Sequence, residues 1–455
     1  MSQQGVIDPA VEAGIFTKDA LADLSHRLGE PQWMMEKRQA AWSLFDRTPM
    51  PTTRDQGWRR TDIRPIKWRD LCLSGFHGSR HASATQRSKL VDLPEPVRSV
   101  LDVDQGAAGR LALLNGQVIW HQMDEELRRQ GVIFTDMTTA VGQHPDLVQQ
   151  HFMTGCVTAG DGKFAALHGA FWDAGTFIYV PEGVNIRQPF QVVVAVEGEG
   201  TTVFPHTLIV AEHSSGVTCI EESLSLGGAQ QAMSNGVVEI IAGDEARVTY
   251  VDIQRWGDHV FNFNTRRAMH SPDSRVVWEM GQLGGRLTRT RVGNVLAGNG
   301  SSAEFNAVYF VSNKQHVDLS TMTHHIGLGT GADLLIKGAA KDSGRAVIQG
   351  LIKIAPGSQQ TDSYLKNDNL LLSNEARIDS IPGLEIDASD VRASHGATVG
   401  RTDEDHVLYL QSRGIPRNTA IQMITEGFFA NVFDRMSQER VREKLETAVA
   451  AKIDD

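Results

Sequence analysis

Cysteine is scarce in this chain of 455 residues, which contains three, at Cys72, Cys156 and Cys219. They lie far apart and no two of them form a C-x-x-C pair, so the sequence predicts neither a disulfide framework nor a structural zinc site. Such a composition suits a reducing compartment, and we therefore expect a cytoplasmic protein.

Long apolar runs and an excess of basic residues are also missing. No apolar run approaches the ~20 residues that a membrane-spanning helix needs, and the N-terminal sequence has neither the basic nor the apolar region of a signal peptide. The formal net charge is −11 and the isoelectric point is about 5.8. Nucleic acids and anionic membranes bind clustered cations, so neither is an expected partner. Proteins or small species are expected instead.

The motifs of several enzyme classes are absent as well. The sequence has no G-x-x-x-x-G-K-[ST] phosphate loop, no H-E-x-x-H and no G-x-S-x-G in a fitting context. Glycine clusters at residues 298–300 and 327–331 precede strand-like residues rather than a helix, so we interpret them as turns. The chain is not expected to hydrolyse nucleotides itself.

Residues 17–45 predict two helices. Thr17 can cap the first, in which leucines recur at helical spacing until Gly29, and Pro31 can begin the second. Residues 49–93 then turn to Arg, Pro, Ser and His with weak periodicity, which is typical of a connector.

From about Gly162 to Asp390 the chain consists of short runs rich in Val, Ile, Thr, Phe and Tyr, separated by turn residues. The segments that follow successive turns can be aligned, and subtracting the numbers of their second residues gives steps of 30, 28, 28, 30 and 28. These second residues are Gly216, Ala246, Ser274, Ser302, Ala332 and Gln360. Such regular strand-and-turn repeats favour a β-solenoid, and an antiparallel sandwich with evenly spaced turns is the alternative.

After residue 400 the pattern becomes helical again. Thr402 can cap a helix with an acidic first turn, Gly414 can end it, and Pro416 can begin a second helix. The second helix carries more aromatic surface than one stripe against the solenoid end requires. We therefore expect a docking surface for a protein, with burial in the core as the alternative. The residues concerned are Met423, Ile424, Phe428, Phe429 and Phe433.

One of the sixteen histidines stands out. His395 lies between Ser394 and Gly396, whose small size leaves the imidazole open, where strand patterns give way to helix. Neutral imidazole is a possible ligand for iron, but one imidazole cannot hold a cluster, so other ligands would have to complete such a site. The adjacent His324 and His325 point to opposite faces of a strand and cannot form one site.

The segment PGLEIDASDVRASHGATVG, which contains His395, and the later YLQSRGI and EGFF resemble the C-terminal signature of the SufB/SufD family of iron–sulfur cluster assembly scaffold proteins. GEPQWMMEKRQAAWSLFDRTPMP is similar to the helical entry segment of that family, and AFWDAGTFIYVPEGV is similar to its β-helix coils. The resemblance extends over most of the chain.

Three positions make the chain resemble the SufD branch. SufB-type proteins carry cysteines where residues 235–236 and 367–369 are Asn-Gly and Asn-Asp-Asn here, and they read HEA where residues 395–397 are His-Gly-Ala. Without those thiols this chain cannot accept sulfur there, because the thiolate is the nucleophile. Two departures from the SufD pattern are Ala393, where many members have Cys, and His168, where Asn is usual.

The resemblance implies a right-handed parallel β-helix with N-terminal and C-terminal α-helical regions. It implies a non-catalytic scaffold that pairs with a SufB-like subunit, docks a SufC-like ATPase through its C-terminal helices, and shares a transient iron–sulfur cluster with SufB. His395 becomes the candidate iron or cluster ligand at the SufB interface. Whether the complex carries a flavin is not determined by the sequence. A solenoid carbohydrate-active enzyme and a metal-free interaction module are the alternatives.

We divide the chain into three parts: an N-terminal helical region with its connector at 1–95, a β-helix core at 96–400, and a C-terminal helical domain at 401–455. The Arg- and Ser-rich tract 79–89 has no counterpart in the resemblance, so no function is assigned to it.

Overall fold

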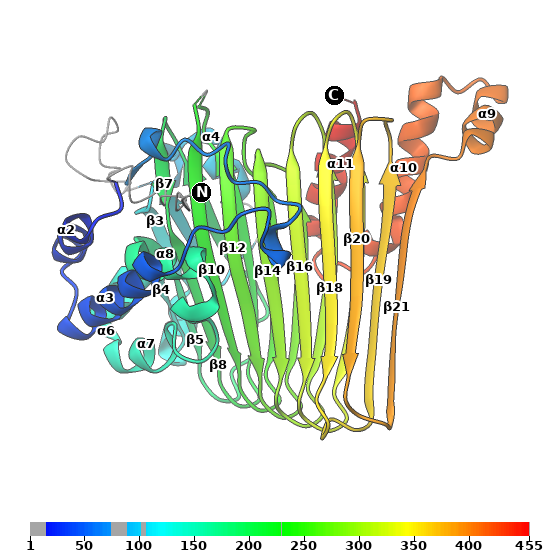
Figure 1. Ribbon diagram of the computed structural model, residues 1–455. Helices are drawn as coiled ribbons and strands as arrows, with labels where there is room; N and C mark the ends of the chain where they lie inside the picture. The colour runs from blue at the N-terminus through cyan, green and yellow to red at the C-terminus, as the bar shows by residue number, and fades with distance from the viewer. Residues whose placement is uncertain (1–14, 74–88, 102–105, 229, 455) are drawn as a thin grey trace, which may run out of the picture.

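The computed structural model describes residues 15–73, 89–101, 106–228 and 230–454. Its centre is a parallel β-solenoid whose coils follow one another along a single axis, with helices at both ends (Figure 1). The prediction of a mainly β, solenoid architecture with helical regions on either side is confirmed. Apart from Lys89, the tract 79–89 lies outside the described residues.

Two sheets form the walls of the solenoid, and the chain passes from one to the other in every coil. The strands of the 11-stranded wall are β1 Cys72–Leu73, β4 Ile133–Asp136, β5 Ala174–Val180, β7 Thr201–Val203, β8 Pro205–Ala211, β10 Ala232–Ala242, β12 Val260–His270, β14 Leu287–Leu296, β16 His316–His325, β18 Arg345–Ile354 and β20 Arg377–Ile386. Those of the 10-stranded wall are β2 Gly109–Leu114, β3 Gln117–Met123, β6 Phe190–Val196, β9 Gly216–Ser225, β11 Arg247–Arg255, β13 Arg275–Gln282, β15 Ser302–Val311, β17 Gly331–Ala340, β19 Thr361–Leu371 and β21 Val391–Arg401. Neighbours from β8 to β20 and from β6 to β21 pair in parallel.

The sequence repeat marks one turn of each coil. Just before β9, β11, β13, β15, β17 and β19 the backbone takes up a positive φ, which glycine adopts freely and Asn or Asp tolerates better than most residues. The residues in this conformation are Ser214, Glu245, Asp273, Gly300, Gly329 and Gln360. The glycine clusters at 298–300 and 327–331 are therefore solenoid turns, as the sequence indicated.

The first two described helices lie on the outer face of the 11-stranded wall. Helices α2 Lys18–Leu28 and α3 Gln32–Arg47 are as predicted: the Thr17 side chain accepts from the Ala20 amide, and Gly29 ends α2 in the left-handed conformation. The other short helices are η1 Gln56–Trp58, η2 Trp68–Asp70, η3 Leu90–Asp92, α4 Glu95–Leu101, α5 Glu125–Arg129, α6 Met137–Gln143, α7 Pro145–His151 and η4 Ala159–Asp161.

The strand pattern expected from Gly162 onward is wrong at its start, because α8 Lys163–Phe171 is a helix. All of its residues are buried between α3 and the 11-stranded wall. A helix without a polar face has no amphipathic period, so its sequence does not distinguish it from a buried strand.

The C-terminal helices are α9 Glu404–Ser412, α10 Arg417–Phe433 and α11 Glu439–Asp454. Helices α10 and α11 pack along the outer face of the 10-stranded wall rather than on the solenoid end, whereas α9 extends away from it (Figure 1). The prediction that Thr402 caps α9 is wrong. The next residue, Asp403, is the cap and accepts from the Asp405 amide, because its φ and ψ bring its carboxylate to the first helical turn.

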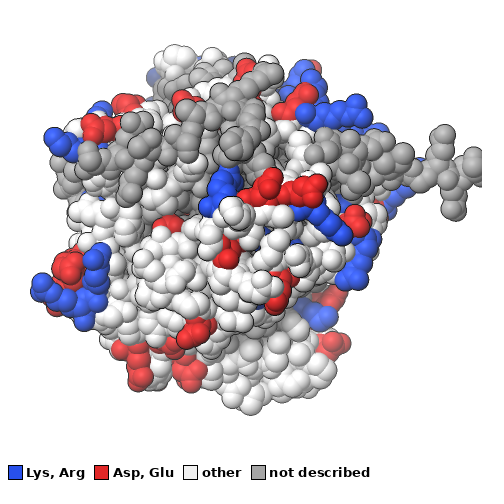
Figure 2. Space-filling model, turned by 90° about the vertical axis from the view of Figure 1, so that its left-hand side faces the viewer, with Lys and Arg blue, Asp and Glu red and all other residues white. Residues whose placement is uncertain are grey.

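Figure 2 shows the face at the N-terminal side of the molecule. Among the described residues drawn there, Lys and Arg stand in small groups beside Asp and Glu and do not form one continuous basic surface. In the described part of the chain, none of the helices combines the length and apolarity required to cross a membrane.

Candidate functional site

His395 is the last member of a ladder of inward-pointing side chains. In-register pairing along the 10-stranded wall aligns one residue from each coil, and side chains aligned in this way share a face of the sheet. From the first coil to the last, the ladder is Phe190, Cys219, Tyr250, Trp278, Phe305, Leu334, Leu365 and His395. The first seven have at most 2% of their surface exposed, whereas His395 is exposed. The imidazole therefore lies over the open mouth of the solenoid, on top of Leu365.

This position differs from the one that the sequence suggested. His395 is in the middle of β21 and not at the change from strand to helix, since β21 continues to Arg401 and α9 begins at Glu404. A rigid strand carries the imidazole, with Ser363 and Leu365 of β19 beneath Ala393 and His395.

The last coil is the most exposed part of the solenoid. Strands β20 and β21 are paired on one side only, and most of their residues are partly or fully exposed. Apolar side chains exposed on or beside this coil are Tyr364 at 40%, Ile386 at 40% and Val399 at 44%. An unpaired strand edge presents free N–H and C=O groups to a further strand.

The open mouth does not hold a complete set of metal ligands. Within the described ranges, no three His, Cys, Asp or Glu side chains come together in an arrangement that could bind a metal ion. The other histidine near this end, His325, is buried and is held by Thr330 at 2.8 Å and Ser363 at 3.1 Å. Its neighbour His324 points outward, so the two do face opposite ways.

The five residues expected to dock a partner divide into two groups on α10. Phe429 and Phe433 are 0% and 4% exposed and pack into the core between α10 and the 10-stranded wall. Phe428 is partly buried beneath Lys337, whose Nζ lies 4.4 Å from the ring centroid. Met423 is 46% exposed and Ile424 is partly buried. A partner reaching α10 would therefore meet Met423 before the phenylalanines.

Sequence reasoning missed two exposed apolar residues on α9, Leu408 at 65% and Tyr409 at 58%. With Met423 they form what we call the α9–α10 apolar patch. The YLQSRGI motif could have drawn attention to this helix. It could not show which face of the helix is exposed, because a short helix with one buried residue, Val407, has no clear apolar face.

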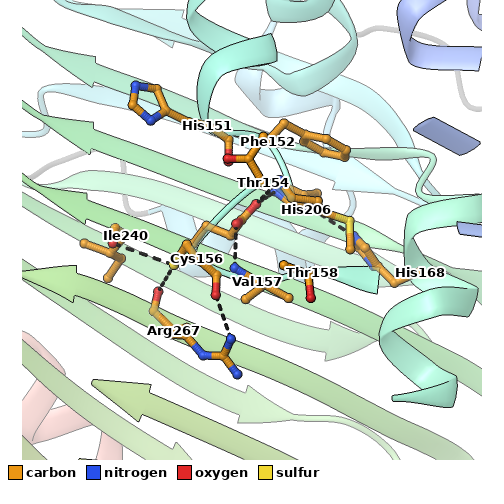
Figure 3. Close-up of polar contacts among 12 residues, drawn as sticks. His151, Phe152, Thr154, Cys156, Val157, Thr158, His168, His206, Ile240 and Arg267 are labelled. Atoms are coloured by element: carbon orange, nitrogen blue, oxygen red, sulfur yellow. Dashed lines mark hydrogen bonds and ion pairs between the residues drawn. The ribbon is translucent and has the colours of Figure 1, made fainter. Parts of the chain in front are cut away.

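A second group of polar side chains, which includes the His168 noted in the sequence, is buried beneath the N-terminal helices (Figure 3). His168 of α8 donates through Nδ1 to the Asn235 carbonyl at 2.8 Å, so its Nε2 accepts from Nδ1 of His206 at 3.0 Å. His206 Nε2 then carries no proton, and it lies 3.1 Å from Glu239 Oε2 without forming a hydrogen bond to it. His168, the departure from the family pattern, thus has a structural role linking α8 to β8 and β10.

Burial is the main cause of the pKa shifts of Glu239, His206 and Cys156. It raises the pKa of Glu239 to about 7, although the Val157 and Met153 amides donate to the carboxylate at 2.9 and 2.8 Å. Burial also lowers the pKa of His206 to about 3, so this imidazole is neutral at physiological pH. The nearby Cys156 thiol is buried, which raises its pKa well above the usual range and makes it a poor nucleophile.

Comparison with known protein families gives matches over most of the chain. The family model described as the SufBD core domain of SUF system FeS cluster assembly matches residues 194–428, and the model of the SufBD protein N-terminal region matches residues 25–192. The chain belongs to the SufBD family. The core match runs from within β6 through β21, so most of the solenoid belongs to the SufBD core, and His395 lies at its open end.

Relatives of this SufBD protein match it over nearly its whole length. The iron–sulfur cluster assembly protein SufD of Bacillus subtilis is 31% identical over 442 residues, 96% of this chain and 98% of the relative. An iron–sulfur cluster assembly SufBD family protein of Staphylococcus epidermidis is 30% identical over 420 residues, 91% of this chain and 88% of the relative. The chain is therefore a SufD-like protein of iron–sulfur cluster assembly.

Proposed function

We propose that this SufD-like protein is a non-catalytic, cytoplasmic scaffold subunit that pairs with a SufB-like subunit and docks a SufC-like ATPase. A transient iron–sulfur cluster, shared with SufB, is the cargo that the complex builds. The observation that supports this most is the position of His395, the exposed last member of an otherwise buried ladder at an unpaired solenoid end.

We propose that the SufB-like subunit pairs with the last coil, because this coil has free backbone groups and exposed apolar side chains. Strands β20 and β21 have free edges, and Tyr364, Ile386 and Val399 expose apolar surface beside them. A second solenoid set against this end would cover both the free backbone groups and the apolar side chains. We propose SufB as this partner, because the family resemblance implies that it has the same fold.

The proposed metal contact uses one residue of this chain. His395 offers an imidazole nitrogen at the mouth, and neighbouring Ala393 offers no thiol. The remaining ligands of a cluster would come from the SufB-like subunit. His395 would then hold the cluster only where the two subunits meet, so cluster assembly would depend on their relative position.

The α9–α10 apolar patch is the docking surface we propose for SufC. Leu408 and Tyr409 are exposed on α9, which extends away from the 10-stranded wall, and Met423 is exposed on α10. ATP hydrolysis is expected in SufC, and a movement of α9 and α10 could be passed to the last coil because α9 follows β21 directly. A ligand acting in this way shifts the population of a shared assembly.

The cluster proposal is tested by co-expressing the protein with SufB and SufC and measuring iron and sulfide in the purified complex. His395→Ala should reduce bound iron and sulfide at least about tenfold if the ligand is essential, while the subunits still copurify. His324→Ala, which removes an outward imidazole from β16, is the matched control and should leave both unchanged. A fully loaded His395→Ala complex would disprove the ligand role.

The docking proposal is tested by retention of SufC. Leu408→Asp places a charge in the α9–α10 apolar patch and should weaken SufC binding by about 100-fold, as expected for a hot-spot residue of about 3 kcal/mol, without loss of SufB. Val91→Asp changes an equally exposed apolar residue, 66% exposed, at the other end of the chain and should have no effect. Equal SufC binding by both variants would show that the patch is not the docking surface.

A further inference from the structure

A cavity of about 290 Å³ lies where the N-terminal connector crosses the 11-stranded wall, far along the solenoid from His395. We call it the α8 cavity. Its walls come from residues 48–58 of the connector, the first residues of α8, and strands β12 and β14. Nothing in the proposed scaffold function uses it.

The beginning of α8 opens into this cavity. Asp161, Gly162, Lys163, Phe164 and Ala165 line it, and no side chain caps the helix. At Gly162 an added Cβ would meet nothing within 4 Å, so there is open space in front of the helix. The first amides of a helix point away from it and, together with the helix dipole, favour an anion.

Two arginines of β14 supply an independent indication of an anion. Arg289 is 6% exposed and lines the cavity; its Nη atoms bind Asp318 and the Gly57 carbonyl, whereas its Nε is a buried donor that finds no acceptor among the described atoms. Burial lowers the pKa of Arg289 despite its ion pair with Asp318, and the guanidinium lies over the Trp58 ring, 4.0 Å from its centroid. An anion in the cavity would offer the Nε–H an acceptor.

Arg291 lies directly beside the helix start. Its Nη1 donates to the Asp161 main-chain carbonyl at 2.9 Å, and the residue lines the same cavity. Both cavity carboxylates are already engaged: Asp161 accepts from Arg267 at 2.6 Å, and Asp55 accepts from the Thr52 amide at 2.6 Å. Lys163 also lines the cavity, but its Nζ donates to the Phe45 carbonyl at 2.7 Å, so the two arginines are the cations considered for an anion.

We propose that the α8 cavity binds a small phosphate-bearing anion, with the first amides of α8 and the guanidinium groups of Arg289 and Arg291 as its donors. Arginine binds phosphate oxygens through two N–H groups at once, and helix amides add further donors, so a tetrahedral anion matches the site better than a planar carboxylate. Free phosphate and a phosphomonoester share this chemistry.

The test is calorimetric titration of the full chain with inorganic phosphate and, separately, with phenyl phosphate, in sodium chloride of matched ionic strength. We expect saturable binding of at least one probe at millimolar concentration. Tighter binding of phenyl phosphate would identify a phosphomonoester as the natural class, and equal binding would identify free phosphate. Absence of saturable heat with both probes would overturn the proposal.

The variants locate the binding. Arg291→Gln should weaken binding about tenfold, since one charge-assisted contact is lost, and Arg291→Lys should restore part of it. Arg247→Gln, an exposed arginine at the start of β11, is the charge-matched control and should bind like the wild type. Equal weakening in Arg247→Gln would mean that only net charge matters, which would also overturn the proposal.

Phenylglyoxal labelling followed by mass spectrometry gives a local readout. Saturating phosphate should protect Arg291 and leave Arg247 reactive, and protection of both or neither would contradict the assignment. Iron and sulfide loading of the complex should be the same in Arg291→Gln and wild type. A failure of the scaffold proposal is thereby distinguishable from a failure of this one.

Discussion

The two ends of the solenoid differ in how the inner face of the terminal coil is covered. At the N-terminal end the ladder starts at Phe190, whose ring stacks on Phe134 of β4 at 4.4 Å. Phe134 also fills the space at Gly109, the neighbour of Phe190 in β2, where an added Cβ would lie 2.6 Å from its ring. At the C-terminal end the ladder stops at His395, which is exposed because none of the described strands pairs with the far side of β21.

The difference shows which end is complete within one chain. A solenoid coil buries its inner face only when a neighbour covers it, so an end must be closed by other elements or by a partner. This protein uses β3, β4 and aromatic residues at one end and leaves polar, exposed residues at the other. The inner face of the 10-stranded wall is thus buried along most of the solenoid and becomes exposed surface at its last strand.

The largest expected effect tests the closed end. Phe190→Ala removes a ring that is 0% exposed and stacked on Phe134, and it should lower the free energy of unfolding by about 3–5 kcal/mol. Urea denaturation of the isolated chain measures this. Phe190→Leu keeps most of the volume and should lose less than half as much. Equal losses in the two variants would mean that ring volume does not close this end.

The next effect concerns the charges buried near the closed end. The pKa of Glu239 is raised from 4.5 to about 7 in the folded state, so the folded protein binds this proton more tightly than the unfolded chain does. Its contribution to stability is therefore greatest below pH 4.5 and is lost as pH rises to about 7. The shift corresponds to about 3 kcal/mol.

This dependence is measured as the difference in free energy of unfolding between wild type and Glu239→Gln at pH 4.5 and pH 7.5. Raising the pH from 4.5 to 7.5 should lower the free energy of unfolding of the wild type by about 3 kcal/mol relative to that of Glu239→Gln. His206, whose pKa is lowered, is present in both proteins, so its opposite dependence largely cancels. Glu182→Gln, at an exposed turn, is the control and should show no such change. A pH-independent difference would contradict the assignment.

The smallest effect sharpens the contrast at the open end. In the isolated chain, His395→Ala should change the free energy of unfolding by no more than about 0.5 kcal/mol, because the side chain is exposed. Within one ladder, Phe190 would then contribute several kcal/mol to the free energy of unfolding and His395 almost nothing. A loss above 2 kcal/mol would show that His395 stabilises the last coil itself.

Much of this architecture could be predicted because it repeats locally. A positive-φ turn precedes each strand from β9 to β19 of the 10-stranded wall at a regular interval, and three of the six positions are Gly or Asp, so the repeat is visible in the sequence. The Thr17 side chain and the left-handed Gly29 define α2 locally. The buried α8 could not be predicted, since its sequence has no polar face. Asp403 and Thr402 are both capable caps, and only the backbone conformation decides between them.

The sequence by itself determined the solenoid, the helical regions at both ends and the motif that contains His395, because turns, caps and short motifs depend on neighbouring residues. Only the tertiary structure decided that His395 ends an inward ladder and that His206 lies between His168 and Glu239. It also decided that Arg291 meets Asp161 just before α8 and that Arg289 lines the same cavity. Each of these depends on the register of several coils or on a helix packed across a sheet. Such contacts join residues distant in the sequence, and no local pattern encodes them.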